Sequence, residues 1–198
     1  MRKYSKVVAW GLIFPLALVA TAGAATEARV PLVCSRGPGG QQYAAVVTLP
    51  SQAAEGATYS VRIDGVTSGA ISHTGLKYIH DMTTEYSLPA GTSYVEGSLR
   101  LVPGTGTANV SADARVAHDG ARIRLTLPGK VESGSSYTAP SFEFQLKVTA
   151  KAGASLPVQL LQYRVRANAI IVGDVDTTCD PNPKPYSIGT TRVTSATP

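Results

Sequence analysis

The chain has 198 residues, a hydrophobic fraction of 43% and a formal net charge of +5, which suit one globular domain with its own core. Three of the 18 basic residues precede position 25, whereas all 13 acidic residues follow it. Without the first 24 residues the net charge is +2, so the composition carries no basic signature of nucleic-acid binding.

The first residues have the three parts of a secretory leader. Basic residues lie within the first six positions, an uncharged apolar run follows at 7–20, and Ala22 and Ala24 are the small residues that signal peptidase needs. An uncleaved anchor is the alternative, because the uncharged stretch is almost long enough to span a bilayer, but Pro15 and the small residues favour cleavage. We expect a signal peptide at 1–24 and a single exported domain at 25–198, without a membrane span after cleavage.

Both cysteines, Cys34 and Cys179, lie in the expected mature chain, one near each end. In an exported protein such a pair most simply forms one disulfide, and two free thiols or an intermolecular link are the alternatives. The bridge would close a loop of about 145 residues, which contributes roughly 4 to 5 kcal/mol in the chain-entropy model.

After the leader, apolar residues alternate with period two, which indicates half-buried strands, and no convincing helix is found. In chain order the runs are QQYAAVVTLP (41–50), ATYSVRIDG (57–65), ARIRLTLPG (121–129) and SFEFQLKVTA (141–150). A longer run, PVQLLQYRVRANAIIVGDV (157–175), is either one long bent strand or two strands joined by a bulge. Glycine and proline turns separate the runs, and this spacing predicts an all-β sandwich or barrel; we favour an immunoglobulin-like β-sandwich.

A pattern of glycine, two small residues and tyrosine occurs three times and ends at Tyr59, Tyr94 and Tyr137. Glycine allows the positive φ of a turn that enters a strand, so we expect each tyrosine to be the first inward residue, with its hydroxyl reaching back to the loop. A series of sugar-binding aromatic residues is the alternative, although buried aromatic residues more often serve packing.

Two segments resemble the adhesin-type immunoglobulin-like repeat domain of bacterial surface proteins: LPAGTSYVEGSLRLVPGTGTANV and ARIRLTLPGKVESGSSYTAPSFEFQLKVTAKAGASLPVQLLQYRVRA. The resemblance covers residues 87–169, and the chain departs from the family in having one such unit and an added N-terminal portion that contains Cys34. The whole chain also looks similar to exported proteins of high-GC bacteria. The resemblance implies a non-enzymatic surface module and transfers no catalytic residue.

An acidic cluster, Asp174, Asp176 and Asp180, lies in the segment GDVDTTCDPNP. Alternation places the three carboxylates on one face, where hard oxygen ligands could bind calcium. The segment lacks the glycine and the bidentate glutamate of a calcium loop, so we favour an acidic edge strand that resists pairing with other edges, and we expect no metal or other cofactor.

Two Arg-x-Arg pairs, Arg122 with Arg124 and Arg164 with Arg166, lie on the polar faces of expected strands. If those strands were neighbours, the four guanidinium groups would form a patch for sulfated or phosphorylated polymers. The alternative, which we favour, is a charged outer face that serves solubility.

The histidines predict no catalytic site. His80 and Asp81 are contiguous, and neighbours on a regular strand point to opposite faces, so we expect no oriented pair. No serine-hydrolase motif is present, although a triad of distant residues would be recognised only by its geometry.

These observations favour a secreted, non-catalytic, adhesin-like module of the cell envelope or extracellular space, with a binding or structural role and another protein or a glycan as its partner. A carrier of a small apolar or lipidic ligand is the first alternative. It needs an unfilled interior, whereas the expected strands look sufficient to fill their own core. A small secreted hydrolase is the second alternative, and it needs a cleft that gathers His73 or His80 with a serine and a carboxylate.

Overall fold

The structure, a computed structural model, describes residues 23–37 and 40–196. Of the expected signal peptide only Gly23 and Ala24 fall within these ranges, so the leader itself lies outside the described residues. No helix in the described ranges combines the length and the hydropathy needed to cross a membrane.

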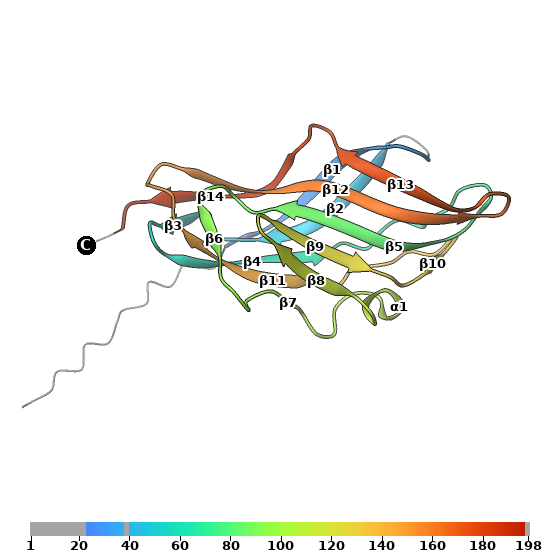
Figure 1. Cartoon of the computed structure of the whole chain (residues 1–198), viewed down its shortest axis with the longest axis horizontal. Helices are drawn as coiled ribbons and strands as arrows, with labels where there is room; N and C mark the ends of the chain where they lie inside the picture. Colours follow the sequence, from blue (N-terminus) through green and yellow to red (C-terminus); the bar gives the residue numbers. More distant parts are fainter. Residues whose placement is uncertain (1–22, 38–39, 197–198) are drawn as a thin grey trace, which may run out of the picture.

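Strands make up most of the chain (Figure 1). They are β1 (Ala25–Cys34), β2 (Gln41–Thr48), β3 (Gln52–Ala54), β4 (Thr58–Gly65), β5 (Leu76–Ser87), β6 (Thr92–Tyr94), β7 (Arg100–Leu101), β8 (Arg115–Asp119), β9 (Arg122–Leu127), β10 (Val131–Glu132), β11 (Phe142–Val148), β12 (Ser155–Ala169), β13 (Gly173–Pro181) and β14 (Tyr186–Thr194). One short helix that the sequence did not predict, α1 (Ala108–Ser111), precedes β8.

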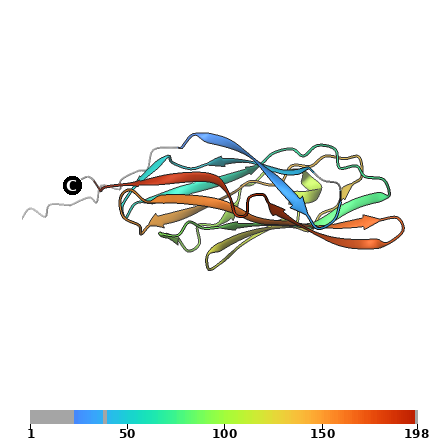
Figure 2. The same ribbon diagram turned by 90° about the horizontal axis from the view of Figure 1, so that it is seen from above.

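The strands form one continuous sheet that curls over on itself into two packed layers (Figures 1 and 2). The first layer has the order β6-β11-β4-β2-β1, and the second has the order β13-β12-β5-β9-β8. β14 pairs with the first half of β12 and, in parallel, with β3. The expected all-β sandwich is therefore confirmed.

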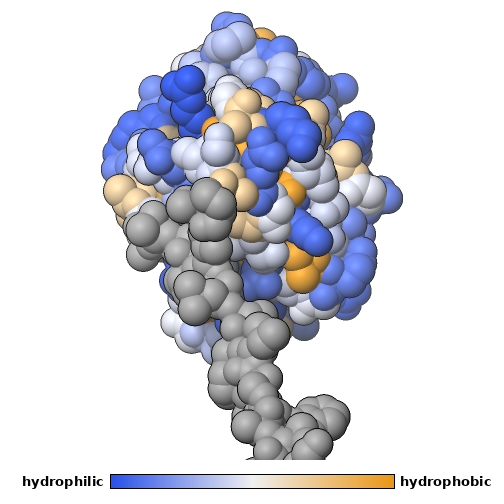
Figure 3. Space-filling view, turned by 90° about the vertical axis from the view of Figure 1, so that its left-hand side faces the viewer, coloured by the Kyte–Doolittle hydropathy of each residue, from blue (hydrophilic) through white to orange (hydrophobic). Residues whose placement is uncertain are grey.

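A single apolar core fills the space between the layers. The first layer contributes alternate residues of β4 and β11, such as Val61 and Phe144, and the second contributes those of β9 and β12, such as Ile123 and Leu160. Burial of this apolar area, at about 25 cal/mol per Å², is the main force that holds the layers together. The end of the sandwich that carries β3, β6 and β14 presents mainly hydrophilic residues where it is visible in Figure 3.

The two layers are joined where β1 changes partner. β1 pairs with β2 from Ala25 to Leu32, and its last residues, 32–34, pair with the end of β13. Cys34 lies directly opposite Cys179 in this pairing, and the two form the expected disulfide. The covalent bridge therefore lies at the junction of the two layers.

The structure corrects the expectation for the run at 157–175. β12 ends at Ala169, and the chain turns back into β13 at Gly173, whose φ is +70°. The apolar residues Ile170, Ile171 and Val172 occupy the turn and are exposed. Their β-branched side chains resemble a strand in the sequence, but the positive φ of the following glycine allows a hairpin there.

The expectation for the three glycine-tyrosine patterns is confirmed in its backbone part, because Gly56, Gly91 and Gly134 all have positive φ. The tyrosines differ in their surroundings. Tyr59 is buried in the core, and the Tyr94 hydroxyl accepts a hydrogen bond of 3.0 Å from the Leu99 backbone N–H in the following loop.

Replacing both cysteines with alanine should lower the free energy of unfolding by about 5 kcal/mol, because the bridge closes a loop whose ends are 145 residues apart. Urea denaturation of the Cys34→Ala/Cys179→Ala variant and of the oxidised parent measures the difference. The reduced parent serves as the control and should behave like the variant. A loss below about 1 kcal/mol would contradict this prediction and would mean that strand pairing alone holds the layers in place.

Candidate functional site

An open cleft of about 630 Å³ lies between the layers at the end opposite to β3 and β14. At this end the β12–β13 hairpin extends to the tip of the molecule (Figure 1). In the opposite layer β4 stops at Gly65, and the irregular segment 66–75 continues the chain. Part of the inner face of the hairpin is therefore covered only by a loop, and the cleft is the space that remains.

One wall of the cleft is apolar and is built from small side chains. It consists of the inward residues of the hairpin, Val165, Ala167 and Ala169 on β12 and Val175 on β13. β-strand alternation turns these residues inward and their charged neighbours outward. Because alanine fills little volume, this wall leaves room for the side chains or the body of a ligand.

Segment 66–75 forms the opposite wall and is fixed by hydrogen bonds to residues 134–138. The Ser68 N–H donates to the Tyr137 carbonyl at 2.8 Å, and the Tyr137 N–H donates to the Ser68 hydroxyl at 3.0 Å. Farther along, Ile71 exchanges two backbone hydrogen bonds with Gly134 and Ser135, of 2.7 and 2.9 Å. These bonds give an irregular segment a defined position at the cleft.

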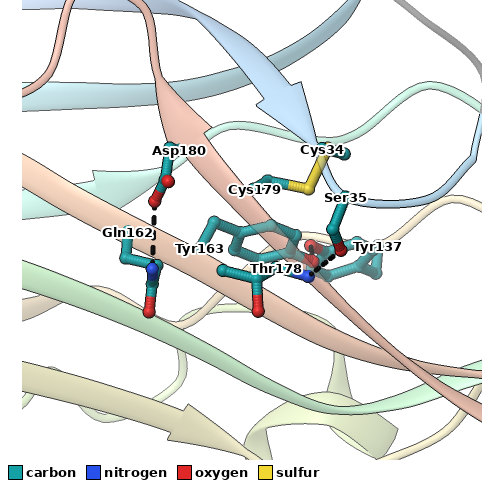
Figure 4. Close-up of a disulfide and its surroundings, with 8 residues drawn as sticks. All are labelled: Cys34, Ser35, Tyr137, Gln162, Tyr163, Thr178, Cys179 and Asp180. Carbon is teal, nitrogen blue, oxygen red and sulfur yellow. Dashed lines mark hydrogen bonds between the residues drawn. A yellow bond between two sulfur atoms is a disulfide. The ribbon is translucent and has the colours of Figure 1, made fainter.

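Tyrosine side chains form the floor of the cleft. The floor consists of Tyr43, Tyr137 and Tyr163. Tyr86 lies fully buried behind Tyr43, and the hydroxyls of these two tyrosines are hydrogen bonded to each other. The hydroxyls of Tyr137 and Tyr163 are 3.2 Å apart, and their rings lie beside the disulfide in Figure 4. Burial raises the pKa of all four phenols above the ordinary value of 10.0, so the floor is polar but uncharged at neutral pH.

The charged residues of the cleft are arginines at its mouth. Among the described residues that line it, Arg29 and Arg36 carry the charge, and no aspartate or glutamate is present. Arg29 forms an exposed ion pair of 2.6 Å with Glu27. The cleft therefore combines an apolar wall, a neutral hydrogen-bonding floor and a positive rim.

The two arginine pairs lie on the outer face of the second layer, away from the cleft. β5 separates β9 from β12, so the pairs are not on neighbouring strands. Glu85 of β5 contacts Arg124 at 3.0 Å and Arg122 at 3.6 Å, and Arg166 contacts Asp176 at 2.9 Å. Each pair thus has a carboxylate beside it, and a polymer-binding patch at these four residues stays a prediction.

The three aspartates lie on the outer face of β13, each with its own partner. Asp174 accepts a hydrogen bond from Asn168. Asp180 accepts one from Lys184 and another from Gln162, and Figure 4 shows the second of these. These contacts hold the pKa of both carboxyl groups below the usual value. Within residues 23–37 and 40–196, no group of His, Cys, Asp and Glu has the arrangement of a metal site. An acidic strand without a calcium ion therefore stays the prediction for this cluster.

The expectation for His80 and Asp81 was wrong, because the two side chains do form a pair. Nδ1 of His80 lies 3.0 Å from the Asp81 carboxylate, and Nε2 lies 3.5 Å from that of Asp174. β5 is irregular here: its pairing with β12 shifts register, and Asp81 has a φ of +48°. A bulge inserts an extra residue and places two consecutive side chains on one face, which strand alternation does not foresee.

The histidines do not meet a serine and a carboxylate in the cleft. His73 lines the cleft, but its Nδ1 lies 3.0 Å from the carbonyl of the adjacent Thr74. His118 lies elsewhere, stacked on Tyr94 with the ring centroids 3.8 Å apart. His80 faces carboxylates on the outer side of the sheet.

Sequence reasoning did not identify the cleft. The alternating strands look sufficient to fill the interior, yet the β12–β13 hairpin extends farther than the opposite layer and leaves the space open. A usable signal was present in Ala167 and Ala169, since two alanines at inward positions of one strand provide little volume for a core.

No protein-family model matches this sequence, and no curated protein matches it. Among solved structures, the chain is similar to a cohesin module from a Clostridium perfringens family 33 glycoside hydrolase, with 8% identity, a TM-score of 0.34, and coverage of 77% of this chain and 96% of that module. It is similar to domains D2 and D3 of the major pilin SpaD from Corynebacterium diphtheriae, with 15% identity, a TM-score of 0.38, and coverage of 67% and 48%.

A third similar structure is the collagen-binding domain from a Staphylococcus aureus adhesin, with 10% identity, a TM-score of 0.30, and coverage of 70% of this chain and 88% of that domain. The chain spans about half of the two-domain pilin structure. At these scores the likeness to a cohesin module, a pilin and an adhesin domain assigns neither a function nor a residue role to this chain.

The tyrosine floor predicts a distinctive alkaline titration. The pKa of these buried phenols is higher in the folded protein than in the unfolded one. The free energy of unfolding is therefore unaffected by the phenols below about pH 10, and it falls above that pH because the unfolded chain ionises first. We expect tyrosinate absorbance to rise in two phases, the second together with unfolding measured by circular dichroism. Tyr163→Phe should reduce the amplitude of the second phase alone. Complete ionisation before unfolding would contradict the prediction.

Proposed function

We propose that this protein is an exported, non-catalytic binding module of the cell envelope or extracellular space. The sequence at 1–24 has the form of a secretory leader, and the Cys34–Cys179 disulfide suits an oxidising compartment. The partner is a protein or a glycan, and its binding site is the cleft between the layers.

The open cleft is the observation that carries this proposal. Its volume, about 630 Å³, lies within the range of about 300 to 1,000 Å³ of many ligand sites, and its apolar wall with a few convergent hydroxyls has the usual composition of such sites. The phenols of Tyr43, Tyr137 and Tyr163 can each donate and accept a hydrogen bond, which suits uncharged polar groups of a partner.

Binding without catalysis fits the residues of the cleft better than hydrolysis does. The described lining contains His73 and the serines Ser68 and Ser72, but no carboxylate that could orient a histidine. The small net charge of the expected mature chain likewise favours a protein or glycan over a nucleic acid.

A carrier of a small apolar or lipidic ligand is the second candidate, and one observation favours it. The expected strands would fill their own core, whereas in the structure an apolar wall of Val165, Ala167, Ala169 and Val175 faces the open cleft. Such a wall would hold the apolar body of a ligand, with Arg36 at the mouth available to an acidic head group.

The fluorescent probe 8-anilinonaphthalene-1-sulfonate, which has an apolar body and one negative charge, tests the cleft directly. The folded protein should bind it saturably, and Ala167→Trp, which fills the cleft from its apolar wall, should weaken binding by about tenfold. Fluorescence titration measures both.

The matched control is Ala117→Trp on the outer edge strand β8, which should leave probe binding unchanged. Thermal unfolding of each variant excludes probe binding to a partly unfolded chain. Equal binding by the parent and by Ala167→Trp would overturn the assignment of the cleft as the site.

Export makes a separate prediction. Protein recovered from its own producer should begin at Ala25, where β1 also begins, and should have lost two hydrogens at the disulfide. Mass spectrometry of the denatured chain before and after reduction measures both changes. A chain that still contains residues 1–24 would contradict cleavage of the leader.

A further inference from the structure

Among the residues that the structure describes, the first half of β13 has a partner strand on one side only. β12 pairs with β13 from Gly173 to Cys179, whereas β1 pairs with it only at residues 179–181. The last contacts on the β1 side are made by Ser35, whose N–H donates to the Thr178 carbonyl at 2.8 Å and whose hydroxyl accepts from the Thr178 N–H at 3.1 Å. No described residue pairs with residues 173–177 on that side.

Alternation defines which backbone groups this edge offers. Both backbone groups of Thr178 point toward β1, so those of Asp176 and Asp174, two and four residues earlier, point the same way. The edge therefore presents two N–H and two C=O groups in the spacing of an antiparallel or parallel ladder. Such groups are the template on which another strand can pair.

The same edge borders the cleft. The side chains of Val175 and Thr177 line the cleft, while those of Asp174 and Asp176 point to the outer face. A strand added here would continue the sheet where β1 leaves it. Every second side chain of that strand would point toward the cleft, and the others would lie beside the two aspartates.

The charges at the edge select the partner. Asp174 and Asp176 are 47% and 80% exposed, and Asp81 is a third carboxylate nearby. Arg166 lies between Asp176 and Asp81, and His80 lies between Asp81 and Asp174. A second copy of this edge would place aspartates opposite aspartates, which destabilises pairing. A strand with lysine or arginine at its outward positions would instead meet carboxylates.

We propose that the partner binds as an added strand: an extended segment of another protein pairs with residues 173–177 of β13, with apolar side chains in the cleft and basic side chains beside Asp174 and Asp176. The five edge residues span about 17 Å, so a segment of about five residues is sufficient. This inference rests on the proposed function, since it names the partner and the binding mode at the same cleft.

A labelled synthetic peptide of alternating valine and lysine is the probe, and fluorescence polarisation measures its binding to the mature, oxidised protein. We expect saturable binding that weakens with salt, and no binding of the matched peptide of alternating valine and glutamate. Hydrogen exchange gives a direct readout, because the amides of Asp174 and Asp176 should exchange rapidly in the free protein and slowly with the peptide.

Three variants separate the contributions. Asp176→Pro removes an N–H that faces the open edge and not β12, and should weaken peptide binding by about tenfold. Ala167→Trp should weaken it similarly by filling the cleft, and Asp174→Asn/Asp176→Asn should reduce both affinity and salt dependence. Each variant must keep the thermal unfolding midpoint of the parent to within a few degrees.

The outcomes distinguish this inference from the proposed function. If 8-anilinonaphthalene-1-sulfonate binds the cleft but the valine-lysine peptide does not, strand addition is wrong and the cleft remains a binding site. Peptide binding that Asp176→Pro leaves intact would also overturn strand addition. A concentration-dependent dimer in analytical ultracentrifugation that Asp176→Pro abolishes would assign the edge to a second copy of this chain instead.

Discussion

The fold depends on the few residues by which β1 passes from one layer to the other. Residues 32–34 are the link through which the layer of β2, β4 and β11 is hydrogen bonded to that of β12, β5 and β9. The disulfide at Cys34 lies at the point where this pairing stops. Because β1 goes no farther along β13, the two layers separate beyond the bridge. The junction that closes the core therefore also produces the open cleft and the edge of β13 that no described residue pairs with.

Strand alternation in the sequence predicted four regular strands but missed β1, although its buried residues also alternate. β2, β4, β9 and β11 alternate without interruption, and each was expected. β5 was missed because its bulge places Ile79 and Met82, three positions apart, on the same buried face. In β14 the buried residues Ile188 and Thr191 are likewise three apart, next to a register shift. A period of two cannot describe a strand whose pairing changes register partway along.

The candidate site was hardly accessible from the sequence. The cleft exists because two layers differ in length, and that difference depends on which strands face each other, not on the pattern within any strand. Tyr43, Tyr137 and Tyr163 come from three separate parts of the chain, and only the fold gathers their hydroxyls. By contrast, the disulfide followed from cysteine number and export alone, because two cysteines allow one intramolecular pairing.

The disulfide also determines how the molecule would carry mechanical load. Ala25 and Thr194 lie at one end of the sandwich, and the bridge lies toward the other. Tension applied between these two positions runs along β1, crosses the sulfur atoms, and returns through the end of β13 and β14. The chain between Cys34 and Cys179, which holds β4, β5, β9, β11 and β12, is bypassed by the covalent path. A pull on the ends would therefore strain the pairing of β1 with β2 and of β14 with β12, but it would not extend the chain between the two cysteines while the bridge is intact.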